Sequence, residues 1–229
     1  MESEQVPVDE PSETKRRTQG GVPTNDLVMS AYQATNDVVF PHVMSLYVTP
    51  GSKVADVTFG KGVFWRRIPK EAYELHATYL KDGIDCRELP YADASFDAVV
   101  FDPPYMHTPG ASAHEGHQNF EAYYRNNKAT SGKKYHEAVL DIYFEAAKEA
   151  NRILKTGGVY IVKCQDEVCA NTQRLTHVEI INELATYGFI CEDLFVVMRT
   201  GRPGVSRLLA QAHARKNHSY FRVSVNFCG

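Results

Sequence analysis

The sequence predicts a doubly wound α/β domain built on a mostly parallel sheet. Short apolar runs typical of buried strands alternate with segments of helical spacing along most of the chain. Strands that alternate with helices favour a parallel sheet, which binds ligands at the carboxyl ends of its strands. Two of the runs end in turns rich in functional groups, one at Asp56 and one at Asp102. The length of 229 residues fits a single domain.

The elements expected along this domain follow from periodicity and turn residues. Residues 1–24 are polar and predict a flexible arm, so the domain proper spans 25–229. Residues 106–134 are polar and weakly periodic, which is typical of an insertion loop that faces a substrate. The mixed apolar spacing of residues 25–47 predicts one or two helices, with Pro41 starting the second.

Beyond residue 50 the pattern predicts both strands and helices. Strands are expected at 52–57, 73–80, 95–101, 159–164, 189–190, 194–198 and 220–227. The last two are expected to pair as an antiparallel hairpin at one edge of the sheet. Helices are expected to begin at 63–68 and to cover 135–154 and 176–187.

Charge is unevenly distributed over the chain. The formal net charge is −3, yet no acidic residue follows Asp193. The last 36 residues carry six basic side chains, which are Arg199, Arg202, Arg207, Arg215, Lys216 and Arg222. This asymmetry favours an anionic partner, the alternative being a solvated surface or a set of structural ion pairs.

Several protein classes are disfavoured by composition. No apolar run approaches the roughly 20 residues that span a bilayer. The N-terminus has no apolar stretch behind its basic residues, so it does not resemble a secretory signal. The five scattered cysteines suggest reduced thiols, so we expect a cytoplasmic protein.

The first functional motif is the glycine-rich turn from Asp56 to Gly62. Gly60 and Gly62 follow a strand, where bare backbone can approach a ligand closely. Neither a third glycine nor a phosphate-binding Lys-Ser/Thr follows, which disfavours a dinucleotide site or a P-loop. An acid before the glycines suits a cationic ligand such as S-adenosylmethionine, whose amino group and sulfonium are positive. A tight structural turn is the alternative.

The second motif is Asp102-Pro103-Pro104-Tyr105, at the end of the buried strand 95–101. The prolines fix the backbone and remove two donors, which leaves the Asp102 carboxylate and nearby carbonyls as acceptors. Acceptors that hold both N–H bonds of an exocyclic amine free its lone pair to attack an electrophilic methyl group. Tyr105 offers a flat face for an extruded base. The alternative is a Pro-Pro turn with a capping Asp and a core Tyr.

These two motifs resemble those of the S-adenosylmethionine-dependent DNA amino-methyltransferases. Asp102–Tyr105 resembles their motif IV, Asp56–Gly62 looks like their motif I, and Asp85–Asp97 resembles the segment through motif III. The likeness covers roughly residues 50–229 and implies a Rossmann-like fold. Asp102, Pro103, Pro104 and Tyr105 would be catalytic. Cofactor contacts would come from Asp56, Thr58, Phe59, Gly60, Gly62, Tyr79, Asp85, Cys86 and Asp102.

In two respects the chain departs from this family. The family usually ends its second strand in an acid that holds the cofactor ribose, whereas here Tyr79 has that place and Asp82 follows three residues later. The large target-recognition domain is missing, so the insertion and the basic end remain to contact nucleic acid. The predicted contacts are Arg125, Lys128, Lys133, Lys134, Arg202, Arg207, Arg215 and Lys216. A homodimer or a specificity partner would supply further recognition.

The resemblance implies methylation of an exocyclic amine in DNA by a prokaryotic or phage-encoded enzyme. Adenine N6 is favoured over cytosine N4, because Asp at the first position of motif IV resembles the adenine enzymes. An RNA base amino-methyltransferase and a non-catalytic nucleic-acid-binding subunit with the same fold are the alternatives. No metal is expected, although His107, His114, His117 and His136 are grouped in sequence. For Trp65, the only tryptophan, core packing is favoured over cofactor stacking.

Overall fold

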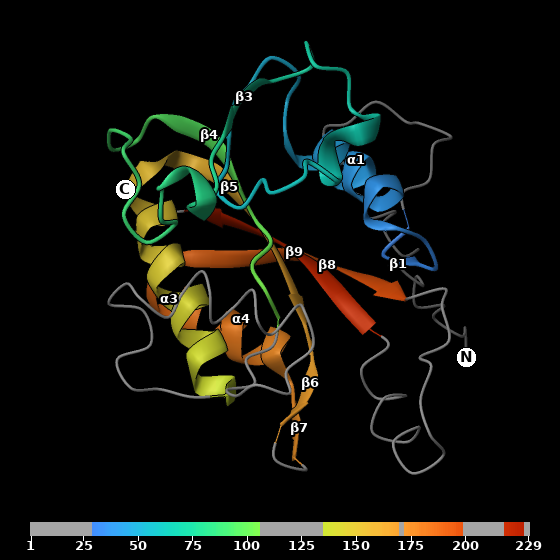
Figure 1. Cartoon of the computed structure of the whole chain (residues 1–229). Coiled ribbons are helices and arrows are strands. Elements are labelled where there is room, and N and C mark those ends of the chain that lie inside the picture. The colour runs from blue at the N-terminus through green and yellow to red at the C-terminus, as the bar shows by residue number, and fades with distance from the viewer. Residues whose placement is uncertain (1–28, 106–134, 170–171, 199–217, 227–229) are drawn as a thin grey trace, which may run out of the picture.

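The structure is a computed structural model, and it describes residues 29–105, 135–169, 172–198 and 218–226. Its centre is a seven-stranded sheet in the order β1-β8-β9-β5-β4-β2-β3 (Figure 1). The strands are β1 Ala31–Tyr32, β2 Lys53–Asp56, β3 Glu74–Ala77, β4 Phe96–Phe101, β5 Leu154–Gln165, β8 Phe189–Met198 and β9 His218–Asn226. All pairs are parallel except those of β9, which runs antiparallel to both of its neighbours, β5 and β8.

Helices cover both faces of this sheet. The helical segments are α1 Asn36–Tyr47, α3 Tyr135–Ile153, α4 Thr176–Thr186 and the one-turn 3-10 helices η1 Phe64–Arg67 and η2 Leu80–Asp82. In Figure 1, α3 and α4 lie together on the side of the sheet away from α1. A small second sheet pairs β6 Glu167–Cys169 with β7 Thr172–Arg174.

Alternation along β4 explains the two layers. Val99 and Phe101 pack into a core with α3 and α4, whereas Ala98 and Val100 pack into a second core with α1 and η1. Successive side chains of a strand point to opposite faces, so a strand covered on both faces reads as one continuous apolar run. The predicted doubly wound, mostly parallel and Rossmann-like fold is confirmed.

The structure differs from the sequence-based expectations in several elements. Pro41 lies inside one continuous helix, because the burial of Val39, Phe40, Val43 and Met44 offsets the one backbone hydrogen bond that proline removes. Residues 189–198 form one strand with a register shift between Cys191 and Asp193, where two strands were expected. The hairpin of β6 and β7 was not predicted.

The predicted antiparallel pair of final strands is confirmed as β8 and β9. It does not form the outermost edge, because the two-residue strand β1 pairs with the outer side of β8. The predicted arm 1–24 and insertion 106–134 lie outside the described residues. Among the described helices, none is long and apolar enough to cross a membrane.

Candidate active site

The carboxyl ends of β2 and β4 lie side by side, as the motifs predicted. The two strands pair in parallel with Asp56 opposite Val100, and Val57 N–H donates to the Val100 carbonyl at 3.1 Å. Beyond the strands, Asp102 N–H donates to Thr58 Oγ1 at 2.7 Å. A single side chain therefore joins the glycine-rich turn to the Asp-Pro-Pro-Tyr segment.

The turn after β2 needs its glycines for their conformation. Gly60 and Gly62 have φ angles of +52° and +61°, in the left-handed region that L side chains rarely adopt. A Cβ atom on Gly62 would also lie 2.7 Å from the Phe59 ring. The loop consequently leaves its backbone open at Gly60, whereas at Gly62 the missing side chain makes room for the Phe59 ring.

Asp56 is buried beneath this loop and its carboxylate is fully engaged. Its exposure is 3%, with Thr58 N–H donating to Oδ1 at 3.0 Å and the Trp65 indole Nε1 donating to Oδ2 at 2.7 Å. Burial raises the pKa of Asp56 to about 7, and the nearby charge of Asp102 adds to this against the two hydrogen bonds. These contacts make Asp56 the organiser of the loop, while its predicted direct contact with a cofactor stays a prediction.

Asp102 has a different environment at the end of β4. Its side chain is 26% exposed, and Oδ1 lies 3.6 Å from the Nζ of Lys163. The Tyr105 hydroxyl donates to the same Oδ1 and accepts from Lys163 Nζ. Pro103 is buried, so the segment is anchored on one side and open on the other.

Tyr105 folds back over this charged pair. Its ring centroid is 4.1 Å from Lys163 Nζ, a cation–π contact. Burial, followed by the negative charge of Asp102, raises the pKa of the Tyr105 phenol well above its ordinary value. The phenol therefore stays protonated and donates to Asp102.

Lys163 is the site residue that the sequence-based prediction missed. It lies in β5 with 3% exposure, and the hydroxyl of Tyr143 donates to its carbonyl at 2.9 Å. A lysine within an apolar strand was the available signal, because lysine is almost never buried without a partner. Its partner could not be identified before the order of β4 and β5 in the sheet was known.

The end of β3 places Tyr79 rather than Asp82 beside the glycine-rich turn. A Cβ atom on Gly60 would lie 3.9 Å from the Tyr79 ring, whereas Asp82 is exposed within η2. Thr78 ties this strand end to β2, since its N–H donates to the Asp56 carbonyl at 2.8 Å. Of the two candidates for the ribose, Tyr79 is the one adjoining the loop.

Asp85 and Cys86 are both close to the sheet but already engaged. The Asp85 carboxylate accepts from the Arg87 backbone N–H at 3.0 Å and from its guanidinium. Burial opposes ionisation of Asp85, yet the Arg87 hydrogen bonds outweigh it and lower its pKa. Cys86 is 3% exposed within the core against α3, and burial raises the pKa of its thiol. Their predicted cofactor contacts stay predictions.

The structure describes only some of the other residues that the sequence predicts for the site. The eight predicted nucleic-acid contacts lie outside the described residues, as do His107, His114 and His117. His136 is buried between Glu167 at 2.8 Å and Glu179 at 3.1 Å. Within the described ranges, no group of three or more His, Cys, Asp or Glu side chains is arranged to hold a metal ion. Trp65 packs against Phe40 and Tyr73, as core packing predicted.

No protein-family model matches the sequence, and no curated protein is detectably similar to it. Solved structures are similar in fold. TTHA0409 from Thermus thermophilus, proposed to be a DNA modification methylase and solved with S-adenosyl-L-methionine, is 20% identical with a TM-score of 0.40. That match covers 64% of this chain and 54% of the other, so the present chain spans about half of that protein's length.

Two further structures cover more of this chain. TrmN from Thermus thermophilus is 15% identical over 83% of this chain and 48% of its own, with a TM-score of 0.48. The [4+2]-cyclase SpnF is 16% identical over 84% of this chain and 81% of its own, with a TM-score of 0.46. The fold is therefore assigned from this chain's own strand order, and its function is argued from its own site.

Proposed function

We propose that this protein is an S-adenosylmethionine-dependent methyltransferase that acts on the exocyclic amine of a flipped nucleobase, with adenine N6 in DNA as the preferred target. The observation that carries the proposal is the position of Asp102. Its carboxylate stands at the carboxyl edge of the sheet and faces the buried ammonium of Lys163, while its backbone N–H donates to the Thr58 hydroxyl of the glycine-rich turn.

The glycine-rich turn suits the cofactor. Gly60 leaves the backbone bare beside the half-buried ring of Tyr79, so a ligand can approach the loop closely there, whereas Gly62 makes room for the Phe59 ring. The cofactor supplies an electrophilic methyl group on its sulfonium. The residues that would hold it are Thr58, Phe59, Gly60, Gly62 and Tyr79. The buried Asp56 would stabilise the conformation of this loop.

The Asp102 carboxylate and the Pro103 carbonyl would accept hydrogen bonds from the two N–H groups of the amine. These contacts would favour a pyramidal nitrogen and would stabilise the positive charge that the nitrogen gains on accepting a methyl group. The methylated nitrogen would then release one proton to water, and no covalent enzyme intermediate is needed. Lys163 acts as a positioning residue, because its ammonium lies 3.6 Å from Asp102 Oδ1 and orients the carboxylate.

Tyr105 would have two positions. In the structure its O–H donates to the Asp102 oxygen that a substrate N–H would use. The phenol thus stands in for the amine, and a bound base would displace it. The freed ring would then be available for stacking on that base.

The test is methyl transfer from labelled S-adenosylmethionine to duplex DNA, single-stranded DNA and RNA, with the digested nucleosides identified by mass spectrometry. We expect N6-methyladenine in DNA, and a loss of about 10²- to 10³-fold in kcat for Asp102→Ala. The matched control is Asp93→Ala, which removes a 77%-exposed acid that pairs with Arg152. Its activity should match that of the unmodified protein.

The outcomes separate the alternatives. Methylated RNA in place of DNA would support the RNA amino-methyltransferase, and N4-methylcytosine the cytosine enzyme. Full activity of Asp102→Ala, with cofactor binding intact by isothermal titration, would overturn the proposed role of Asp102. If the unmodified protein bound nucleic acid but gave no heat with S-adenosylmethionine, the non-catalytic subunit would be favoured.

A further inference from the structure

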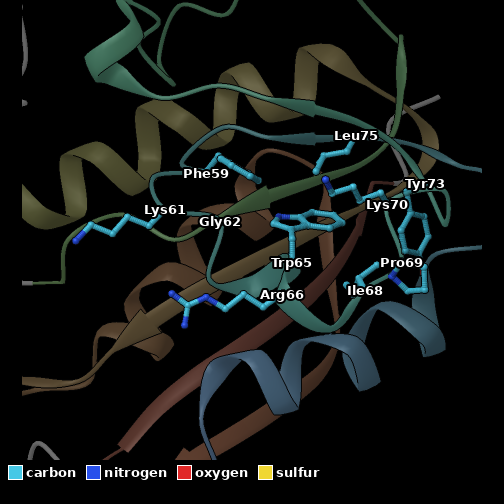
Figure 2. Close-up of a pocket in the computed structure, with 10 residues that line it drawn as sticks. All are labelled: Phe59, Lys61, Gly62, Trp65, Arg66, Ile68, Pro69, Lys70, Tyr73 and Leu75. Carbon is cyan, nitrogen blue, oxygen red and sulfur yellow. The ribbon is translucent and has the colours of Figure 1, made fainter.

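A cavity of about 360 Å³ lies between η1 and the amino-terminal half of β3 (Figure 2). Trp65 occupies the middle of its wall, between Phe59 and Tyr73. The remaining lining residues are Lys61, Gly62, Arg66, Ile68, Pro69, Lys70 and Leu75.

The cavity exists because the chain takes a short path from β2 to β3. Between the two strands the only helical element is the single turn η1, Phe64–Arg67. One turn is too short to cover the outer face of β3, so Leu75 and Trp65 remain half-buried. The indole N–H is taken by Asp56, which leaves the apolar face of the ring for a ligand.

Cations surround this apolar wall. Lys61, Arg66 and Lys70 are exposed and carry no ion pair with any residue in the described ranges. Their neighbour Arg67 behaves differently, since its Nε donates to Asp37 at 2.8 Å. In Figure 2, Lys61 and Arg66 extend away from the indole on the side of the glycine-rich turn. An anionic group bound at this rim would meet uncompensated positive charge.

We propose that this cavity binds a nucleotide, with the base against Trp65 and the phosphate at the cationic rim. A planar apolar wall bordered by cations suits a base joined to a phosphate, because stacking and charge are satisfied together. The cavity shares Phe59 and Gly62 with the proposed cofactor loop, but neither Asp102 nor Tyr105 lines it. Nucleotide binding there goes beyond the proposed function and needs no methyl transfer.

Trp65 is the only tryptophan of the chain, so its fluorescence reports on this cavity directly. Titration of the full chain with adenosine monophosphate and with a hexadeoxyadenylate strand should change the emission in a saturable way. Inorganic phosphate, which lacks a base, should leave it unchanged. A response to both nucleotides identifies a free nucleotide as sufficient, and a response to the strand alone identifies a nucleotide within single-stranded nucleic acid.

Charge variants make the test specific. Removing both cations on the loop side with Lys61→Gln and Arg66→Gln should weaken binding about tenfold and lower the salt dependence of strand binding by about two charges. Arg67→Gln is the matched control, because it lies on the same turn but faces Asp37. It should bind as the unmodified protein does.

Three results would overturn the proposal. One is an unchanged emission with both nucleotides. Another is equal affinity in the double variant and in Arg67→Gln. The third is complete displacement of the nucleotide by S-adenosylmethionine, which would make the cavity part of the cofactor site. None depends on methyl transfer, so failure here is distinguishable from failure of the proposed function.

Discussion

Two aspartates end neighbouring parallel strands, and their surroundings give them different capacities. Asp56 is buried, uncharged neighbours occupy both of its oxygens, and its pKa is raised to about 7. Asp102 is partly open to solvent and is balanced by the ammonium of Lys163. An acid at a strand end can therefore hold the following loop in place or remain available to a substrate. The side chains that face the acid decide between these two roles.

The largest expected effect concerns the pH dependence contributed by Asp56. Its pKa rises from 3.8 when unfolded to about 7 when folded, so the folded chain holds the proton more tightly. The stability from this group is fully present below pH 3.8 and is lost as pH rises through about 7. A rise of about three units in the pKa corresponds to about 4 kcal/mol in the free energy of unfolding.

Asparagine cannot titrate, so Asp56→Asn should make the free energy of unfolding less dependent on pH in this range. Urea unfolding between pH 4 and 8 measures the free energy of unfolding across the window. The control is Asp97→Asn, since hydrogen bonding to Lys155 lowers the pKa of Asp97 below this range. An unchanged slope in Asp56→Asn would show that Asp56 is ionised throughout.

The next effect separates the buried charge pair from a surface pair on the same strand. Lys163→Met leaves Asp102 without its counter-charge and should lower the free energy of unfolding by about 3 kcal/mol. Lys155→Met breaks a pair with Asp97 in which both side chains are over one-third exposed, at 2.6 Å, and should cost at most about 1 kcal/mol.

Lys163 also has a functional readout that a purely structural role would not produce. Without the ammonium to hold the Asp102 carboxylate in place, kcat should fall while the affinity for S-adenosylmethionine, measured by isothermal titration, stays unchanged. Lys163→Arg keeps the charge and should restore kcat in part. Equal kcat for all three proteins would contradict the positioning role.

A smaller effect tests the link between the two strand ends. Thr58→Val removes the oxygen that accepts from Asp102 N–H and leaves this donor unpaired, at a cost of about 2 kcal/mol by urea unfolding. Thr186→Val, which removes an exposed hydroxyl bonded to the Glu183 carbonyl, is the control and should change stability by less than about 0.5 kcal/mol. Equal losses would mean that the link contributes nothing of its own.

The smallest expected effect concerns Trp65. Trp65→Phe removes the indole N–H from Asp56 and should cost about 1 kcal/mol. Because that hydrogen bond lowers the pKa of Asp56, the pH window described above should move upward in this variant. Tyr73→Phe loses only a 3.3 Å hydrogen bond to the Val48 carbonyl and should leave the window in place.

Local patterns predicted much of the fold. The buried runs at β2, β4 and β5 and the periodicity of α3 were recognisable, because burial on two faces and helical spacing leave marks in adjacent residues. Elements that depend on distant partners were missed or divided. Local preference predicts a helix start at Pro41 and a break at the β8 bulge, whereas packing against distant residues keeps both elements continuous.

The sequence by itself determined the turn chemistry: glycines where φ is positive after β2, and an acid with two prolines after β4. Only the tertiary structure decided which groups these acids face. Trp65 reaches Asp56 from nine residues away, while Lys163 reaches Asp102 from the neighbouring strand. The reason is physical, since the pKa and the contacts of a carboxylate depend on the groups within a few ångströms of it. In a parallel sheet, neighbouring strands are far apart in the chain, so the sequence alone does not show which groups these are.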